Sequence, residues 1–214
     1  VLAALEPPRI DLLVVTHVDQ DHVLGVLKLL DDAHHVAVGE VWFNGYDHLL
    51  DVTLETFGAR DGERLTTLLL DQRLPWNATV GQRSVEVGRV MPTAAFGARL
   101  DVVAPDRRLL ERLAPVWEKE CRKHGLIPGA AARRPPAPPG FEQMGRLDIE
   151  ALAATPFDAD GSATNASSIG FLFEHEGVRL LFTGDGDDHR LVESLRPLAQ
   201  AEGGRLRLDA MKVA

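Results

Sequence analysis

Residues 16–25 read T-H-V-D-Q-D-H-V-L-G and join two segments of different periodicity. The segment before them, residues 10–15, is apolar and predicts a buried strand. The segment after them, residues 23–30, carries its apolar residues at the spacing of a helix. Histidine and aspartate side chains are therefore concentrated where a strand ends and a helix begins.

Four of these side chains are potential metal ligands: His17, Asp19, Asp21 and His22. His17 and Asp19 are two apart and point the same way in extended backbone, whereas Asp21 and His22 follow where the chain turns. All four offer nitrogen or oxygen donors suited to a divalent ion. The alternative is an acidic helix N-terminus, with Asp19 or Asp21 as the cap and the histidines incidental. A cap needs one carboxylate and no histidine, so we favour the metal site.

This stretch resembles the first metal motif of the metallo-β-lactamase superfamily, H-x-H-x-D-H, here in the form H-x-D-x-D-H. That form is similar to the branch that includes the hydrolase domain of bacterial competence DNA-uptake channel proteins and many stand-alone bacterial hydrolases. Two later segments resemble the same branch. Residues 183–185, T-G-D, follow an apolar strand like its Gly-Asp motif, and residues 165–168, N-A-S-S, resemble its N-x-S-S segment.

The resemblance implies the fold of that superfamily. We expect an α/β chain forming a four-layer αββα sandwich, incomplete at both ends. Residues 1–214 would be a single domain, because this length suits one domain or one domain with an insertion. Residues 125–146 are rich in proline, glycine and arginine, which predicts a linker or insertion there.

The resemblance also implies a role for each ligand. His17 and Asp19 would serve one ion, Asp21 and His22 would serve a second, and Asp185 would bridge the two. Asp21 is also cast as the carboxylate that orients the attacking water, which makes it the catalytic residue. One or two divalent ions would activate this water and polarise the scissile bond.

Two departures from the superfamily pattern bear on the ions. Asp19 stands where a histidine is usual, and a carboxylate shifts the preference of the site toward manganese, magnesium or iron, with zinc still compatible. The histidine expected before the Gly-Asp motif has no counterpart, and Asn165 or Ser167 stands near that place. Their oxygens are weak ligands, or contacts for a substrate. We expect zinc or manganese, with iron or magnesium as alternatives.

Three of the later residues have simpler alternatives. Asp185 alone could be a helix cap or a turn residue, and Asn165 could be a turn residue before a strand. His189 follows two aspartates and could simply belong to a helix start, and it is also a candidate to orient a metal ligand through a hydrogen bond. The metal role of Asp185 depends on its occurrence together with the first motif.

Composition limits the partners. The formal net charge is −9, which argues against a broad surface for extended nucleic acid but leaves room for a small or nucleotide-type substrate at a metal centre. No apolar run approaches the ~18 residues that a membrane span requires, and the first residues lack the basic region of a signal peptide. The lone Cys121 suits a cytoplasmic protein and predicts a structural or surface thiol and not a nucleophile. Nothing in the sequence fixes the oligomeric state.

We therefore expect a metal-dependent hydrolase. The bond is predicted to be a phosphodiester, because the branch with aspartate at this position includes nuclease-like members. The alternatives are an ester, lactone or amide hydrolase, or a catalytically weak metal-binding domain that acts as a sensor or effector.

The remaining elements follow from local pattern. We expect helices at residues 60–73, 105–124 and 189–198, the last capped by Asp187 or Asp188. We expect strands at residues 36–43, 85–90 and 100–103 and a hairpin of residues 168–173 and 178–182, with His175 exposed in its turn.

The two ends of the sequence carry a further expectation. Residues 206–214 have the apolar character of a strand inside a sheet. In the branch that the chain resembles, this strand is followed by a further histidine ligand, and a hairpin precedes the first metal motif. We therefore expect the 214 residues to be a fragment that binds metal weakly.

Overall fold

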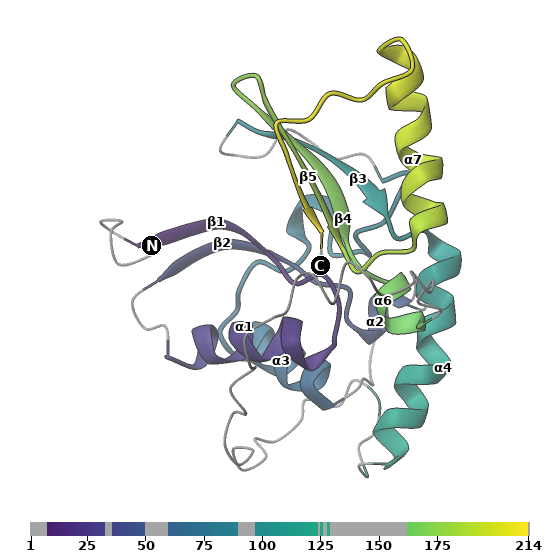
Figure 1. The fold of residues 1–214 in the computed structure, drawn as a ribbon. Helices are drawn as coiled ribbons and strands as arrows, with labels where there is room; N and C mark the ends of the chain where they lie inside the picture. Colours follow the sequence, from purple (N-terminus) through teal and green to yellow (C-terminus); the bar gives the residue numbers. More distant parts are fainter. Residues whose placement is uncertain are drawn as a thin grey trace, which may run out of the picture.

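A computed structural model describes residues 8–32, 36–49, 60–89, 97–123, 125, 128 and 162–213. Within these residues the chain is α/β and contains two β-sheets (Figure 1). Residues 1–7 lie outside the described part of the chain. The predicted linker at residues 125–146 also lies outside it, apart from Gly125 and Pro128.

The first sheet pairs β1 (Arg9–Val14) with β2 (Ala37–Trp42) in parallel, and α1 (Gln20–Asp32) connects them. Both strands and the helix occur where the pattern predicts them. Apolar residues of α1 and α3 (Arg60–Asp71) pack on one face of this sheet, and they include Leu27, Leu65 and Leu69. Residues 12–14 of β1 are only half-buried, so the strand is less enclosed than its apolar run predicts.

The second sheet has the order β3-β4-β5-β6. It consists of β3 (Arg99–Ala104), β4 (Gly170–His175), β5 (Val178–Gly184) and β6 (Ala210–Val213). The first three strands are antiparallel neighbours, and β5 and β6 are parallel. The predicted hairpin is thus confirmed as β4 and β5.

One helix, α7 (Asp188–Ala201), covers the second sheet (Figure 1). Its Leu191 and Leu195 pack against Leu172 and Leu181 of the strands. The helix starts at the predicted cap, because the Asp187 carboxylate accepts a hydrogen bond from Arg190 N at 2.8 Å.

A separate apolar cluster lies between the two sheets. Trp42 of β2 meets Phe171 of β4 edge to face with ring centroids 5.9 Å apart, and Phe171 stacks on Phe182 of β5 at 4.9 Å. The inner faces of both sheets therefore bury one another, while helices cover their outer faces.

The longest helix, α4 (Arg107–Lys123), confirms the prediction for residues 105–124. Its buried face includes Leu110, Leu113 and Trp117, whereas Val116 is exposed. Cys121 is buried, and burial raises the pKa of its thiol to about 12, which suits a structural thiol.

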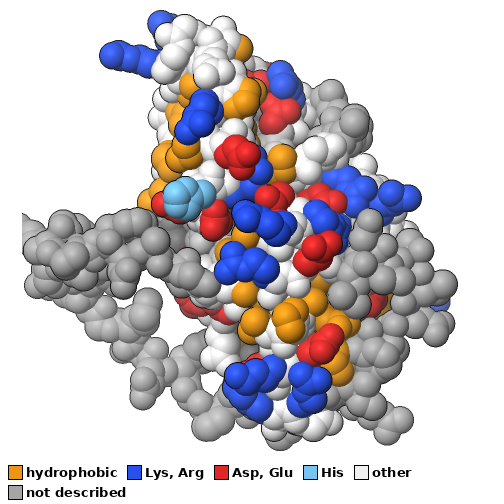
Figure 2. Space-filling model, turned by 90° about the vertical axis from the view of Figure 1, so that its right-hand side faces the viewer, with side chains coloured by type: hydrophobic (Ala, Val, Ile, Leu, Met, Phe, Trp, Pro, Cys, Tyr) orange, Lys and Arg blue, Asp and Glu red, His pale blue; other side chains and the backbone are white. Residues whose placement is uncertain are grey.

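The surface over α4 and α7 carries charged side chains of both signs, interspersed (Figure 2). Arg190 pairs with Glu193 at 2.9 Å and with Asp106 at 3.5 Å, and Lys123 pairs with Glu120 at 2.6 Å. Among the described side chains, this face therefore presents no extended basic patch. No helix in the described part of the chain is long and apolar enough to span a bilayer.

The strand predicted at residues 85–90 is wrong, because the described residues 85–89 form a loop. Val85 is fully buried, but its backbone pairs with a side chain and not with a strand. The Asn44 amide donates to Val85 O at 2.8 Å, and its Oδ1 accepts from Val85 N at 2.8 Å. The Asn44 amide thus provides the hydrogen bonds that a neighbouring strand would otherwise make with Val85.

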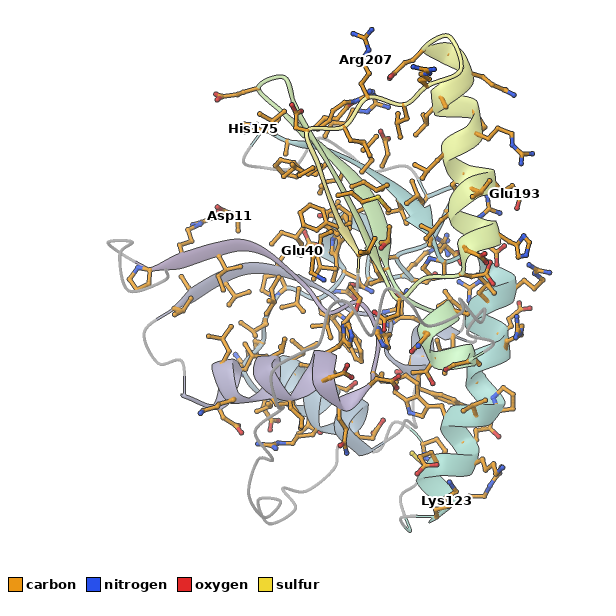
Figure 3. The ribbon with its side chains drawn as sticks, viewed as in Figure 1. Asp11, Glu40, Lys123, His175, Glu193 and Arg207 are labelled. Carbon is orange, nitrogen blue, oxygen red and sulfur yellow. The ribbon has the colours of Figure 1, made fainter. Side chains whose placement is uncertain are left out.

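His175 is half-buried and not in the turn, contrary to expectation. It is the last residue of β4 and pairs with Val178, so the turn contains only Glu176 and Gly177, both with positive φ. Figure 3 places His175 near this turn.

The sequence predicts a strand in residues 206–214. Of the described residues in this range, Ala210–Val213 form it as β6, which lies at an edge of the second sheet with all four residues exposed. Among the described residues β6 pairs with β5 alone, so Met211 and Val213 each keep 54% of their surface exposed.

Candidate metal centre

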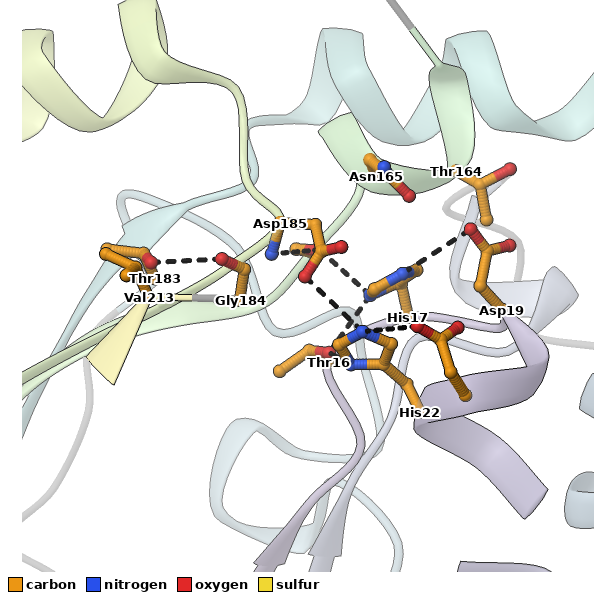
Figure 4. A network of polar contacts seen from close by, with 12 residues as sticks. Thr16, His17, Asp19, His22, Thr164, Asn165, Thr183, Gly184, Asp185 and Val213 are labelled. Atoms are coloured by element: carbon orange, nitrogen blue, oxygen red, sulfur yellow. Dashed lines mark hydrogen bonds and ion pairs between the residues drawn. The ribbon is translucent and has the colours of Figure 1, made fainter. Parts of the chain in front are cut away.

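Three element ends meet at one point of the fold (Figure 4). The chain leaves β1 and reaches His17, α1 begins at Gln20 and carries His22 in its first turn, and Asp185 follows directly after β5. The backbone links these segments, because Ile169 N donates to Thr16 O at 2.9 Å just before β4 begins.

His17, His22 and Asp185 form a compact donor group. One ligand atom from each lies within 4.8 Å of the other two. His22 Nε2 is 3.4 Å from Asp185 Oδ1, and the two imidazole rings are 4.1 Å apart at their centroids. Two donors bound to one ion at ~2.1 Å in tetrahedral geometry are about 3.4 Å apart, so this spacing suits shared ligands.

Burial makes this arrangement costly without a partner. The His17 side chain is fully buried, and its Nε2 atom forms no hydrogen bond within the described structure. The same holds for Asp185 Oδ1. Buried polar atoms are almost always paired, with protein, water or an ion, so these two atoms indicate a missing partner. A nitrogen and a carboxylate oxygen are donors that a divalent ion accepts.

The other ring nitrogens of both histidines face hydroxyl groups. Thr16 Oγ1 lies 3.0 Å from His17 Nδ1 and 3.2 Å from His22 Nδ1. Ser168 Oγ, fully buried, lies 3.0 Å from His17 Nδ1 and accepts a hydrogen bond from Asp185 N at 3.2 Å. Each imidazole is thereby held from its Nδ1 side, which leaves Nε2 toward the donor group.

The two remaining predicted ligands flank the donor group. Asp19 Oδ2 is 3.6 Å from His17 Nε2, and Asp21 Oδ2 is 3.6 Å from His22 Nε2. The Asp19 side chain is 43% exposed and the Asp21 side chain 78% exposed, so both stand on the solvent side. The five predicted ligands thus lie together, with Asp21 the most accessible.

Of the three weaker candidates, one lies next to the donor group and two do not. Asn165 lies on a short helix, α6 (Ala163–Ala166), and its backbone carbonyl accepts from Ser168 N at 2.9 Å, which puts it next to the site (Figure 4). Ser167 is turned away, because its hydroxyl donates to Thr164 O at 2.6 Å. His189 is exposed in the first turn of α7, and within the described structure no contact joins it to the donor group.

Thr16 and Ser168 are the residues that sequence reasoning missed. Thr16 directly precedes the motif, and Ser168 is the second serine of the quoted N-A-S-S segment. Both were visible as hydroxyl residues next to candidate ligands. Their role depends on the approach of residues 16–17 to residues 168–169, which no local pattern reveals.

Comparison of the chain with protein-family models finds no matching family. Comparisons with curated proteins and with solved structures likewise find no match.

Proposed function

We propose that this protein is a metal-dependent hydrolase of the metallo-β-lactamase superfamily that acts on a phosphodiester. The observation that carries the proposal is the convergence of His17, His22 and Asp185, with His17 Nε2 and Asp185 Oδ1 buried and without hydrogen bonds in the described structure. Three protein donors with Asp19 and Asp21 beside them suit zinc or manganese, with iron or magnesium as alternatives.

The arrangement of the elements supports the same family. Helices α1 and α3 pack on the first sheet, the two sheets share an apolar cluster, and α7 packs on the second sheet. We propose that these are the four layers of an αββα sandwich. The donor group lies at the strand ends of both sheets, where β1 and β5 end.

The residues of the donor group and the two flanking aspartates would have distinct roles. His17, His22 and Asp185 would hold the ion, with Asp19 and Asp21 as further ligands on the open side. When bound, a divalent ion supplies Lewis acidity, which lowers the pKa of water and polarises the scissile bond. Asp21 is exposed enough to meet a substrate, and its carboxylate is placed to accept a proton from water and to orient it.

The choice of bond rests on the resemblance to nuclease-like hydrolases, and ester, lactone or amide hydrolysis is the alternative. The net charge of −9 favours a small or nucleotide-type substrate over extended nucleic acid. The single, buried cysteine suits the reducing cytoplasm, where we propose that the protein acts.

A second candidate is a metal-binding sensor or effector with little turnover. The observation that favours it is the compactness of the donor group: only His17, His22 and Asp185 come within mutual binding distance among the described residues. Such a group suits one ion, whereas the two-ion mechanism needs further ligands.

The experiment measures bound metal by elemental analysis and turnover of bis-p-nitrophenyl phosphate with added manganese or zinc. The wild type and the His22→Ala variant are compared, and His175→Ala serves as a matched control because His175 ends β4 at the side of the hairpin turn and is not in the donor group (Figure 3). Metal and turnover that are lost in His22→Ala alone support the hydrolase. Metal without turnover of phosphodiesters, esters or amides favours the sensor, and absence of bound metal refutes both.

A further inference from the structure

Two hydroxyl groups lie behind the donor group, and together they contact each of its three residues. Thr16 Oγ1 is within hydrogen-bond distance of Nδ1 in both His17 and His22. Ser168 Oγ is within that distance of His17 Nδ1 and accepts from the backbone N–H of Asp185. Residues from distant parts of the chain are thus joined through two oxygen atoms.

The burial of His17 Nε2 favours one arrangement of protons in this ring. A neutral histidine carries a proton on only one ring nitrogen. With the proton on Nδ1 of His17, this N–H faces the hydroxyl oxygens of Thr16 and Ser168, and either oxygen can accept it. With the proton on Nε2 of His17, this N–H would be buried without a hydrogen bond, because the Asp19 carboxylate is 3.6 Å away.

We propose that Thr16 and Ser168 are positioning residues that keep His17 protonated on Nδ1, and so leave its Nε2 lone pair available to the ion, while Thr16 also holds the ring of His22. The inference rests on the metal role proposed above. Hydrogen bonds on the far nitrogen of a ligand histidine fix its tautomer and ring orientation and raise its basicity. Ser168 also fixes the backbone of Asp185, so a single hydroxyl positions two ligands.

Close packing holds the two hydroxyls in place. Gly184 has φ +54°, and a Cβ at this position would lie 3.1 Å from Ser168 Cβ and 3.2 Å from Thr16 Cβ. The backbone that precedes Asp185 therefore lies directly against both residues. Ser168 is fully buried, which excludes water as a competing partner for its hydroxyl.

The test has a readout that does not depend on catalysis. Long-range nitrogen–proton NMR of the metal-free wild type identifies the protonated ring nitrogen of each histidine, and His17→Gln and His22→Gln assign the two sets of signals. We expect Nδ1–H in the His17 ring. Protonation of His17 on Nε2 in the metal-free wild type would overturn the proposal.

Metal affinity provides the second readout, measured by calorimetry with manganese and with zinc. We expect Ser168→Ala and Thr16→Val to weaken binding about 10–100-fold, and Thr16→Ser, which keeps the hydroxyl, to retain wild-type affinity. Ser167→Ala controls for the loss of a buried serine hydroxyl, because this group faces Thr164 O. Equal affinity of the Ser168→Ala variant and the wild type would overturn the proposal.

The two proposals fail in different ways. A wild type that binds neither ion refutes the proposed function, while the NMR readout still decides the tautomer. If Ser168→Ala does not fold, the pair Thr16→Val and Thr16→Ser decides the role of the hydroxyls, because equal affinities in these two variants would contradict it.

Discussion

His22 Nε2 lies 3.4 Å from Asp185 Oδ1, and the two atoms reach this spacing from opposite kinds of element end. His22 belongs to the first turn of α1, whereas Asp185 follows the last residue of β5. The contact therefore depends on both sheets being correctly packed, since β5 and the strand that precedes α1 belong to different sheets. The geometry of the donor group therefore depends on the packing of the whole fold.

Metal binding should stabilise the native protein through this contact. A ligand that binds only the folded state at 100 times its Kd adds about 2.7 kcal/mol. We expect zinc or manganese to raise the melting temperature of the wild type and a chelator to reverse the rise. Asp185→Asn keeps the shape of the side chain but removes its charge, and it should abolish most of the shift. An equal shift in Asp185→Asn and the wild type would place the ion elsewhere.

Asp21→Ala should separate catalysis from folding. The Asp21 side chain is 78% exposed, so its removal should change the free energy of unfolding by less than about 0.5 kcal/mol. Turnover of bis-p-nitrophenyl phosphate should be lost, because the variant lacks the carboxylate that orients water. Urea unfolding measures the stability and the assay measures the turnover of one and the same preparation. Asp11→Ala, an exposed carboxylate on β1, is the matched control and should keep full turnover.

Asn44→Ala tests the loop that replaced a predicted strand. Asn44 makes two hydrogen bonds to the backbone of buried Val85, and an unpaired buried group costs about 1–3 kcal/mol. We expect a loss of about 2–4 kcal/mol in the free energy of unfolding, measured in urea. Arg83→Ala removes an exposed side chain from the same loop and should have little effect. Similar losses in both variants would mean that the Asn44 amide does not support the loop.

The sequence predicts best those elements whose own pattern determines burial. The helices at residues 23–30 and 105–124 have apolar stripes that pack on the core, and both occur as α1 and α4. The strand–helix junction also places its four polar side chains together, because strand period and helix start are local properties.

What the sequence does not predict depends on partners distant in the chain. The segment at residues 85–89 reads like a strand, yet the Asn44 side chain takes the backbone hydrogen bonds of Val85, and Val87 N donates to Pro105 O. Thr16 and Ser168 acquire their role only when β1 and β4 come together.

The pH dependence of stability should report on a buried acid far from the donor group in sequence, Glu63 of α3. Burial raises the pKa of Glu63 from 4.5 to about 9, and the nearby Asp47 carboxylate adds to the rise. Between these values the unfolded chain has lost the Glu63 proton while the folded chain retains it. The unfolded state then binds fewer protons, so stability falls as pH rises.

A window from pH 6.5 to 9 avoids the titrations of His48 and Cys121. Burial lowers the pKa of His48 from 6.5 to about 4, so His48 makes stability rise with pH, but only below 6.5. The pKa of Cys121 is raised from 9 to about 12, so the thiol contributes only above pH 9. Within the window we expect the wild type to lose stability by up to about 1.4 kcal/mol per pH unit.

The variant Glu63→Gln should remove this slope, because an amide does not titrate. Urea unfolding at intervals between pH 6.5 and 9 measures this slope. The free energy of unfolding of the variant should rise relative to that of the wild type as the pH increases. Glu111→Gln changes an exposed glutamate on α4 and should keep the wild-type slope. Parallel curves for Glu63→Gln and the wild type would show that Glu63 ionises in the folded protein as readily as in the unfolded chain.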